Sequence, residues 1–245
     1  MKENYGNKCI FGIRPIIEAI ENEIQIDKAL IQKGLKGNLF NDLKELIKIH
    51  KISCQYVPIQ KINRLTKKNH QGVYAFISPV SFYSTEEIVM DLYDKGQTPK
   101  ILILDRISDV RNFGAIVRSA ECLGIHAVII PEKGAAQVNS DSIKTSAGAL
   151  LKIPICKEKS LVNTIKNLKQ NGLEIIACTE KSSIPVYKHS FNKPLAIIMG
   201  SEKDGISSDI LKLSDVKLKI PLKGSIESLN VSVATGIILF EASKK

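Results

Sequence analysis

Long apolar runs are missing from this chain of 245 residues. No run approaches the roughly 20 apolar residues that a helix needs to span a bilayer. The N-terminus also lacks an apolar segment, and Glu3 and Asn4 follow closely on Met1, so it does not resemble a secretory signal. The sequence therefore predicts a cytoplasmic protein without a membrane partner.

Clustered metal ligands are missing as well. The five cysteines are scattered and at least 22 residues apart, and the four histidines are equally isolated. Disulfide frameworks and zinc sites need closely spaced thiols or imidazoles. We therefore expect neither a disulfide framework nor a metal site.

The charge is positive and unevenly distributed. Hydrophobic residues make up 44% and charged residues 24% of the chain, as in ordinary globular proteins. The formal net charge of +10 suggests a polyanionic partner. Residues 1–78 hold 13 Lys and Arg against 7 Asp and Glu, whereas the remaining residues hold 22 against 18. The first third of the chain is therefore expected to bind the polyanionic partner. For any single lysine, exposure to solvent without such a contact is an equal alternative.

The pattern of apolar residues predicts two α/β domains. Residues 1–78 alternate short β-rich runs with amphipathic segments, which indicates a small domain. Residues 79–100, with Pro79, a Ser/Thr cluster and the turn-like 96–99, are predicted to be a linker. In 101–245, apolar runs at 101–104, 127–130, 174–178 and 195–199 alternate with helical stretches at 115–123 and 161–168. This alternation predicts a mostly parallel sheet with helices on both faces.

Three polar or glycine-rich clusters, at 105–114, 200–205 and 221–230, follow apolar segments of the second domain. Ligands of parallel sheets bind outside the carboxyl ends of the strands. In the first cluster, Asn112 and Gly114 lie at a predicted helix mouth, where free N–H groups favour an anion, and Arg118 follows in the helix. Taken alone, these residues favour a plainer interpretation, with Asn112 as an ordinary N-cap and Arg118 as a surface charge.

The other two clusters bear on which ligand the site can bind. Gly200 and Gly205 have P-loop spacing, but Ile206-Ser207 stands where a P-loop requires Lys-Ser/Thr, and no GxGxxG occurs, so both phosphate-binding motifs are excluded. In the third cluster, Ser228 and Asn230 flank Leu229 directly before a predicted helix. Three such clusters after successive strands favour one shared site over three independent caps.

Three runs in these clusters resemble a known family. NFGAIVRSAECLG, IIMGSEKDGIS and IPLKGSIESLNVSVATGIILFE resemble the three motifs of the SpoU, or TrmH-like, branch of SPOUT RNA 2′-O-ribose methyltransferases. FGIRPIIEAI and NHQGVYA resemble the N-terminal RNA-binding domain of the bacterial 23S rRNA guanosine-2′-O-methyltransferase branch. The first motif departs modestly, because Asp109-Val110-Arg111 stands where relatives often carry Asp-Pro-His.

The resemblance implies a fold, a cofactor and a set of site residues. The fold would be a small N-terminal α/β RNA-binding domain plus a C-terminal parallel-sheet SPOUT domain with a deep trefoil knot, and the protein would be a homodimer with its site near the subunit interface. The residues implied to line an S-adenosyl-L-methionine site are Gly200, Ile220, Leu222 and Leu229. The implied catalytic residues are Asn112, Arg118, Glu202, Ser228 and Asn230.

These features predict methylation of a ribose 2′-hydroxyl in structured RNA, with a guanosine of 23S rRNA as the preferred substrate. A tRNA ribose methyltransferase with the same chemistry is one alternative. A non-catalytic RNA-binding protein that keeps the fold as a docking platform is the other. Because all five implied catalytic residue types are present, the sequence favours an enzyme.

Overall fold

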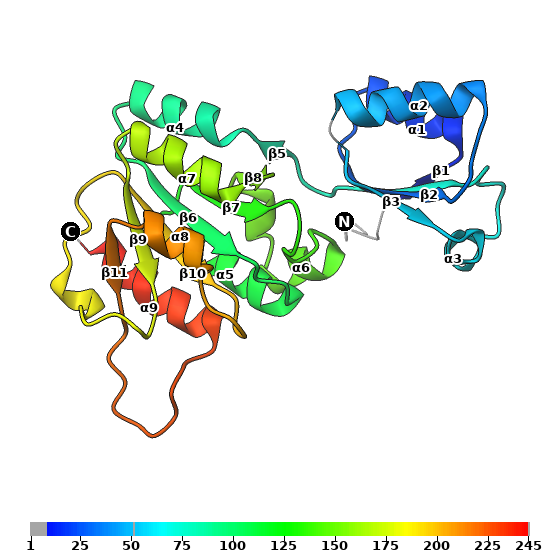
Figure 1. Cartoon of the computed structure of the whole chain (residues 1–245). Helices are drawn as coiled ribbons and strands as arrows, with labels where there is room; N and C mark the ends of the chain where they lie inside the picture. The colour runs from blue at the N-terminus through cyan, green and yellow to red at the C-terminus, as the bar shows by residue number, and fades with distance from the viewer. Residues whose placement is uncertain (1–8, 51, 245) are drawn as a thin grey trace. The chain divides into compact units, whose positions relative to one another are not determined.

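The computed structural model describes residues 9–50 and 52–244. The chain forms two compact units (Figure 1). The first runs to Ser81 and also includes Val138–Ser140, and the second comprises Phe82–Gln137 with Asp141–Lys245.

The first unit is a four-stranded sheet with helices. Its sheet has the order β1-β4-β2-β3, in which β2 and β3 are parallel and β4 runs antiparallel to β1 and β2. Helices α1 and α2 cover one face around buried Ile16, Ile31 and Leu43, and Ile62 of α3 packs with Leu30, Val57 and Tyr74. The elements are β1 (Cys9–Phe11), α1 (Ile13–Glu21), β2 (Ile26–Gln32), α2 (Asn38–Ile49), β3 (Cys54–Val57), α3 (Ile59–Leu65) and β4 (Val73–Ile77).

The second unit is built on a seven-stranded sheet of order β11-β9-β10-β6-β7-β8-β5, and all its strand pairs are parallel. Its strands are β5 (Phe82–Tyr83), β6 (Lys100–Asp105), β7 (Ala127–Pro131), β8 (Ile155–Glu158), β9 (Glu174–Cys178), β10 (Leu195–Gly200) and β11 (Val216–Leu218). Its helices are α4 (Thr85–Asp94), α5 (Val110–Cys122), α6 (Ser140–Thr145), α7 (Leu161–Gln170), α8 (Ser208–Leu213) and α9 (Val231–Ser243), with short 3-10 turns at Ala149–Leu151 and Val186–Lys188. The predicted α/β class with a parallel sheet is confirmed.

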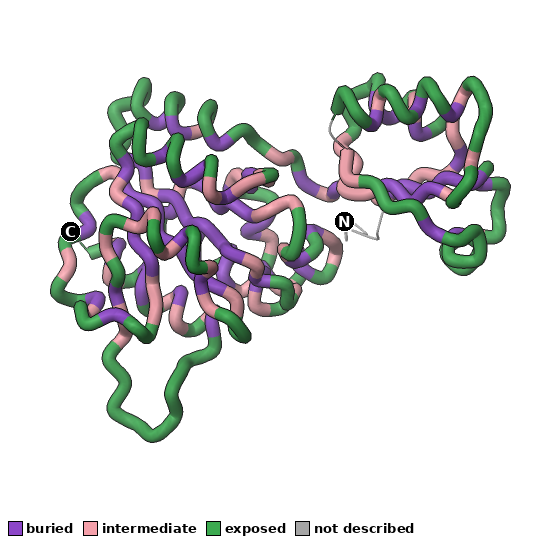
Figure 2. Tube along the Cα trace, in the orientation of Figure 1, coloured by how far each residue is buried: buried purple, intermediate pink, exposed green. Residues whose placement is uncertain are grey.

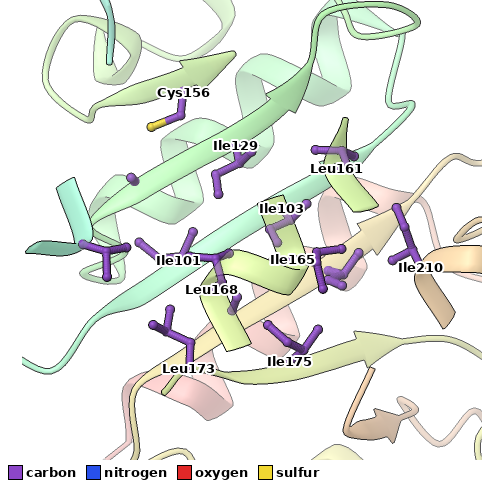
Figure 3. Close-up of a cluster of buried hydrophobic side chains, with 14 of the residues drawn as sticks. Ile101, Ile103, Ile129, Cys156, Leu161, Ile165, Leu168, Leu173, Ile175 and Ile210 are labelled. Carbon is purple, nitrogen blue, oxygen red and sulfur yellow. The ribbon is translucent and has the colours of Figure 1, made fainter. Parts of the chain in front are cut away.

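Helices cover both faces of this sheet. On one face, side chains from α4, α7 and α8 pack on strand residues such as Ile101, Ile103 and Ile175 (Figure 3). On the other face, α5 and α9 pack against each other, and α9 also packs on β10. The central strands are therefore buried on both sides, which explains why their sequences are continuous apolar runs (Figure 2).

The segment 79–100, predicted to be a linker, contains strand β5 and helix α4 instead. Ser84 caps α4 by accepting a hydrogen bond from the Glu87 N–H, and Val89 and Leu92 are buried in the core of the second unit. The Ser/Thr cluster that suggested a linker is a helix start, because a hydroxyl followed three residues later by Glu is a capping pattern.

Candidate functional site

Two polar loops begin side by side at one edge of the large sheet. Strand β6 ends at Asp105 and its parallel neighbour β10 ends at Gly200, and these two residues are paired in register. Because parallel strands deliver their carboxyl ends to the same edge, the first and second clusters both start here.

Helix α5 begins earlier than the sequence suggests. Its N-cap is Asp109, whose carboxylate accepts a hydrogen bond of 2.8 Å from the Asn112 N–H. The capping interpretation of Asn112 is therefore wrong, and its side-chain amide is left for other partners. Gly114 lies inside the helix, where an added Cβ would come within 2.7 Å of the Thr145 Cβ in α6, so this glycine serves close packing.

The amide of Asn112 joins the three clusters. Its Nδ2 donates to the Glu202 carboxylate, and its Oδ1 accepts a hydrogen bond of 3.1 Å from Asn230 Nδ2. Glu202 and Asn230 lie 90 and 118 residues after Asn112 in the sequence, and both contact its side chain. A single side chain links the first turn of α5, the loop after β10 and the start of α9.

Asn230 has two tasks at once. Its Oδ1 caps α9 by accepting from the Ser232 N–H at 2.9 Å and from the Val233 N–H at 3.4 Å, while its Nδ2 donates to Asn112. The Ser232 hydroxyl donates to the same Oδ1 at 2.6 Å. Partners on both ends of the amide fix its orientation.

The loop after β10 folds back on itself. The Ser201 and Gly205 backbones exchange hydrogen bonds, with Ser201 N to Gly205 O at 3.2 Å and Gly205 N to Ser201 O at 2.9 Å. A Cβ added to Gly200 would lie 2.2 Å from the Gly205 carbonyl carbon and from the Ile206 nitrogen. No residue with a side chain fits at position 200 unless the backbone moves.

Beneath this loop lies a polar pair that the sequence interpretation missed. The buried Asp105 carboxylate accepts hydrogen bonds from Arg106 Nε at 3.0 Å and from the Ser207 N–H at 2.7 Å. Arg106 in turn donates from Nη2 to the Gly205 carbonyl at 3.2 Å. The hydrogen bond to Asp105 raises the pKa of the Arg106 guanidinium. An acidic residue at the end of the apolar run 101–104 is the sequence signal that could have identified Asp105.

The third cluster is a long exposed segment. Every residue of 221–230 is exposed, and the segment leaves the body of the second unit as an open loop before α9 (Figures 1 and 2). It carries apolar side chains in spite of this exposure, since Leu222 is 40%, Ile226 78% and Leu229 39% exposed. Ile220, at the base of the loop, is half-buried. Apolar side chains gathered on an exposed segment mark a surface that contacts a ligand or another macromolecule.

Arg118 and Ser228 stand apart from the Asn112 cluster. Arg118 is exposed on α5 six residues beyond Asn112, about 9 Å along the helix axis. Within residues 9–50 and 52–244, neither side chain has a hydrogen bond or ion pair to another side chain of the site. The chain by itself therefore brings together Asn112, Glu202 and Asn230, and leaves Arg118 and Ser228 outside this network.

In the described part of the chain, no group of three or more His, Cys, Asp or Glu side chains is arranged to hold a metal ion. A helix long and apolar enough to cross a membrane is likewise not found among those residues.

Comparison with known proteins identifies both parts of the chain. Residues 99–240 match the SpoU rRNA Methylase family, and residues 9–83 match the family described as RNA 2′-O ribose methyltransferase substrate binding. A protein of Staphylococcus saprophyticus assigned to the TrmH family of tRNA/rRNA methyltransferases is 34% identical over 236 residues, which cover 96% of this chain and 95% of that protein.

Solved structures have the same fold. The SpoU methyltransferase AviRb of Streptomyces viridochromogenes, in complex with AdoMet, superposes with a TM-score of 0.61 at 23% identity and covers 97% of this chain and 90% of its own. The TrmH/SpoU tRNA modifying enzyme of A. aeolicus is 31% identical with a TM-score of 0.55, over 64% of this chain and 82% of its own.

Proposed function

This chain belongs to the SpoU/TrmH family of RNA methyltransferases, and on that premise we propose that it methylates a ribose 2′-hydroxyl of structured RNA, preferentially of a guanosine in 23S rRNA. The observation that carries the proposal is the Asn112 network, which ties three loops together at one edge of the sheet. The preference for 23S rRNA rests on the resemblance of the N-terminal sequence, and the cytoplasmic location stays a prediction.

The residues of this edge fit S-adenosylmethionine as the methyl donor. When bound, S-adenosylmethionine supplies an activated methyl group on a positively charged sulfur. We assign its binding to the Gly200 backbone and to the Ile220, Leu222 and Leu229 side chains. These aliphatic side chains suit a donor whose charge is lost during transfer, because an apolar surround favours the neutralised state.

The polar residues position the acceptor. The 2′-oxygen must face the methyl group in line. As the oxygen–carbon bond forms, the methyl–sulfur bond breaks and the hydroxyl proton passes to solvent water at this exposed edge. Orientation alone lowers such barriers substantially. We assign the orienting role to Asn112, Ser228 and Asn230, and Glu202 tethers the loop after β10 through its contact with Asn112. We assign Arg118 to the target phosphate and to stabilisation of the developing alkoxide, because its forked N–H donors form charge-assisted hydrogen bonds with anionic oxygens.

We also propose that the protein is a homodimer through α9. Val233, Ile237 and Phe240 are spaced four and three residues apart, so they form one stripe, and they are 51%, 36% and 55% exposed. The opposite side of α9 is buried through Ile238 and Leu239. A helix that is apolar on all sides needs cover on its outer face. A second copy would supply this cover and could bring its Arg118 or Ser228 to the Asn112 cluster, which a single chain leaves incomplete.

The first unit is assigned to RNA binding because residues 1–78 carry a net charge of +6 and residues 9–83 match a substrate-binding family. We retain 101–245 as the methyltransferase domain. The trefoil knot of this domain stays a prediction.

The function is tested by titration with S-adenosylmethionine, followed by transfer of labelled methyl groups to 23S rRNA and to tRNA. We expect cofactor binding and labelling of 23S rRNA at a ribose. Labelling of tRNA alone would favour the tRNA alternative, to which the TrmH/SpoU tRNA modifying enzyme of A. aeolicus is the parallel. Failure to bind the cofactor would favour a docking platform. Mapping of ribose methylation in a deletion strain identifies the nucleotide.

Arg118→Ala separates two roles of the arginine. We expect methyl transfer to be abolished while the affinity for S-adenosylmethionine stays nearly unchanged, since the side chain is assigned to the RNA phosphate and the alkoxide. Equal losses of binding and transfer would show that Arg118 belongs to the cofactor site instead.

A further inference from the structure

Arg106 occupies an unusual position for an arginine. It follows the last residue of β6 and has a φ of 59°, in the left-handed region that glycine adopts freely and other residues rarely do. Position 106 therefore carries a long side chain where the backbone conformation favours glycine. Interactions of that side chain must offset the strain.

Those interactions all lead to the loop after β10. The guanidinium is anchored on Asp105, with Nε to Oδ1 at 3.0 Å and Nη2 to Oδ2 at 3.4 Å. Its Nη2 also donates to the Gly205 carbonyl at 3.2 Å, and its Nη1 lies 3.7 Å from the Asp204 carboxylate. Asp105 itself accepts from the Ser207 N–H at 2.7 Å. We call Asp105 and Arg106 together the clasp.

The clasp holds the far end of the loop that carries Gly200 and Glu202. The near end is fixed by the pairing of β10 with β6, whereas residues 202–204 are exposed and project from the body of the unit. The Asp105 side chain is 4% exposed, so its charge is neutralised mainly by Arg106 and by the Ser207 N–H. Separating a buried charge from its partners is costly because it leaves the charge uncompensated, so the contacts of Asp105 with Arg106 and Ser207 oppose movement of this end of the loop.

We propose that Arg106 is a positioning residue for the cofactor site: it holds the 200–207 loop in the conformation that presents the Gly200 backbone and keeps Glu202 in reach of Asn112. The inference rests on the proposed function, because it assigns the loop to S-adenosylmethionine. Without the clasp the loop samples other conformations. Cofactor binding must then select the competent one, which weakens the apparent affinity in proportion to its population.

Three substitutions of Arg106 distinguish a positioning role from support of the fold. Arg106→Gly removes the side chain and relieves the backbone strain, whereas Arg106→Ala removes the side chain and keeps the strain. Arg106→Lys keeps the positive charge but lacks the forked donors that bind Asp105 and Gly205 at the same time. Lys166→Ala is the matched control, because Lys166 is an exposed cation on α7 and lies outside the three site clusters. The measurements are thermal unfolding, the KM for S-adenosylmethionine, kcat, and amide hydrogen exchange without cofactor.

We expect the KM for S-adenosylmethionine to rise about tenfold for both the Gly and the Ala variant, as it would if the competent loop fell to about a tenth of the population. The Lys variant should lie between these and the native protein, and kcat at saturating cofactor should stay within about twofold. Thermal stability should differ between Gly and Ala, with Gly the more stable. The Lys166→Ala control should keep the native KM.

Two outcomes would overturn the inference. A KM that follows the thermal stability, so that Gly resembles the native protein and only Ala is impaired, would reduce Arg106 to a structural role. Unchanged exchange of the Gly205 and Ser207 amides in Arg106→Gly would show that the clasp does not hold the loop. The exchange result needs no cofactor, so it is distinct from a failure of the native protein to bind S-adenosylmethionine, which would overturn the proposed function.

Discussion

At the scale of single residues, Asn230 is a cap and a connector in one side chain, and the two roles can be separated. Asn230→Asp keeps an N-cap oxygen for the Ser232 and Val233 N–H groups but loses the donor to Asn112. We expect its free energy of unfolding to stay within about 0.5 kcal/mol of native, because Asp and Asn cap equally well. Methyl transfer should fall by about a hundredfold, since a donor that orients the site is lost.

Asn230→Ala is the matched comparison, because it loses the cap as well and should be about 1 kcal/mol less stable. Urea unfolding and a methyl-transfer assay measure both variants. If Asn230→Asp transferred methyl groups at the native rate, the link to Asn112 would have no part in the reaction.

Replacement of Gly200 or Gly236 by alanine should change the stability of the protein in opposite directions. Gly200→Ala places a Cβ 2.2 Å from backbone atoms that cannot move separately, so we expect a loss of several kcal/mol or failure to fold. Gly236→Ala, inside α9, meets only Ser119 Oγ at 3.9 Å and should gain up to about 1 kcal/mol from helix propensity. Thermal unfolding of the two variants checks both signs. Equal stability of both variants would contradict the close approach of the loop to β10.

At the scale of elements, the junction of β6 and β7 carries a pH dependence. His126 precedes β7 and accepts a hydrogen bond of 3.0 Å at Nδ1 from the Lys100 N–H. Burial, and then the charge of Lys100, lower the pKa of this imidazole. The unfolded chain therefore binds a proton at a higher pH than the folded chain does. The stability contribution is fully present above the unfolded value of about 6.5 and is lost as the pH falls through the folded pKa.

His126→Asn tests this dependence, because an amide oxygen can replace the Nδ1 acceptor but does not titrate in this range. We expect the native protein to lose more of its free energy of unfolding between pH 7.5 and pH 5 than the variant loses. Urea unfolding at a series of pH values measures both. Parallel curves for the two proteins would mean that His126 does not contribute.

The elements that could be predicted from sequence are those with a strong periodic signal. The runs at 101–104, 127–130 and 195–199 lie in strands, because the buried strands of a parallel sheet are continuously apolar. Strands β1 and β8 were missed, since three or four residues carry too little pattern and their pairing depends on distant strands. Helix α4 was missed because the Ser/Thr residues at its start were interpreted as part of a linker.

The candidate site was predictable to a similar extent. Asn112, Glu202 and Asn230 meet because clusters that follow parallel strands share an edge, which is a rule of topology. Asp105 has a sequence signal in its place at the end of an apolar run, whereas its pairing with Arg106 depends on a left-handed backbone conformation that an arginine does not signal. Arg118 lies outside the Asn112 network of the single chain, and its proposed arrival from a second copy is something that no pattern within one sequence specifies.

At the scale of the whole molecule, the exposed stripe on α9 predicts the oligomeric state. Light scattering during gel filtration should give twice the chain mass of 27.0 kDa for the native protein. Phe240→Asp places a charge in the stripe and should shift the protein toward the monomer, with loss of methyl transfer, because a charge without a partner is costly in an apolar interface. Met90→Asp, an equally exposed position on α4, is the control and should stay dimeric. A native monomer would overturn the dimer proposal.

The open loop at 221–230 has a consequence for protease treatment. Lys223 lies within ten consecutive exposed residues, so trypsin should cut there before it reaches the folded elements. The fragment after the cut keeps α9, which stays attached through its buried Ile238, Leu239 and Ala242. A nicked molecule should therefore migrate as intact protein on a native gel and separate into two pieces only in detergent.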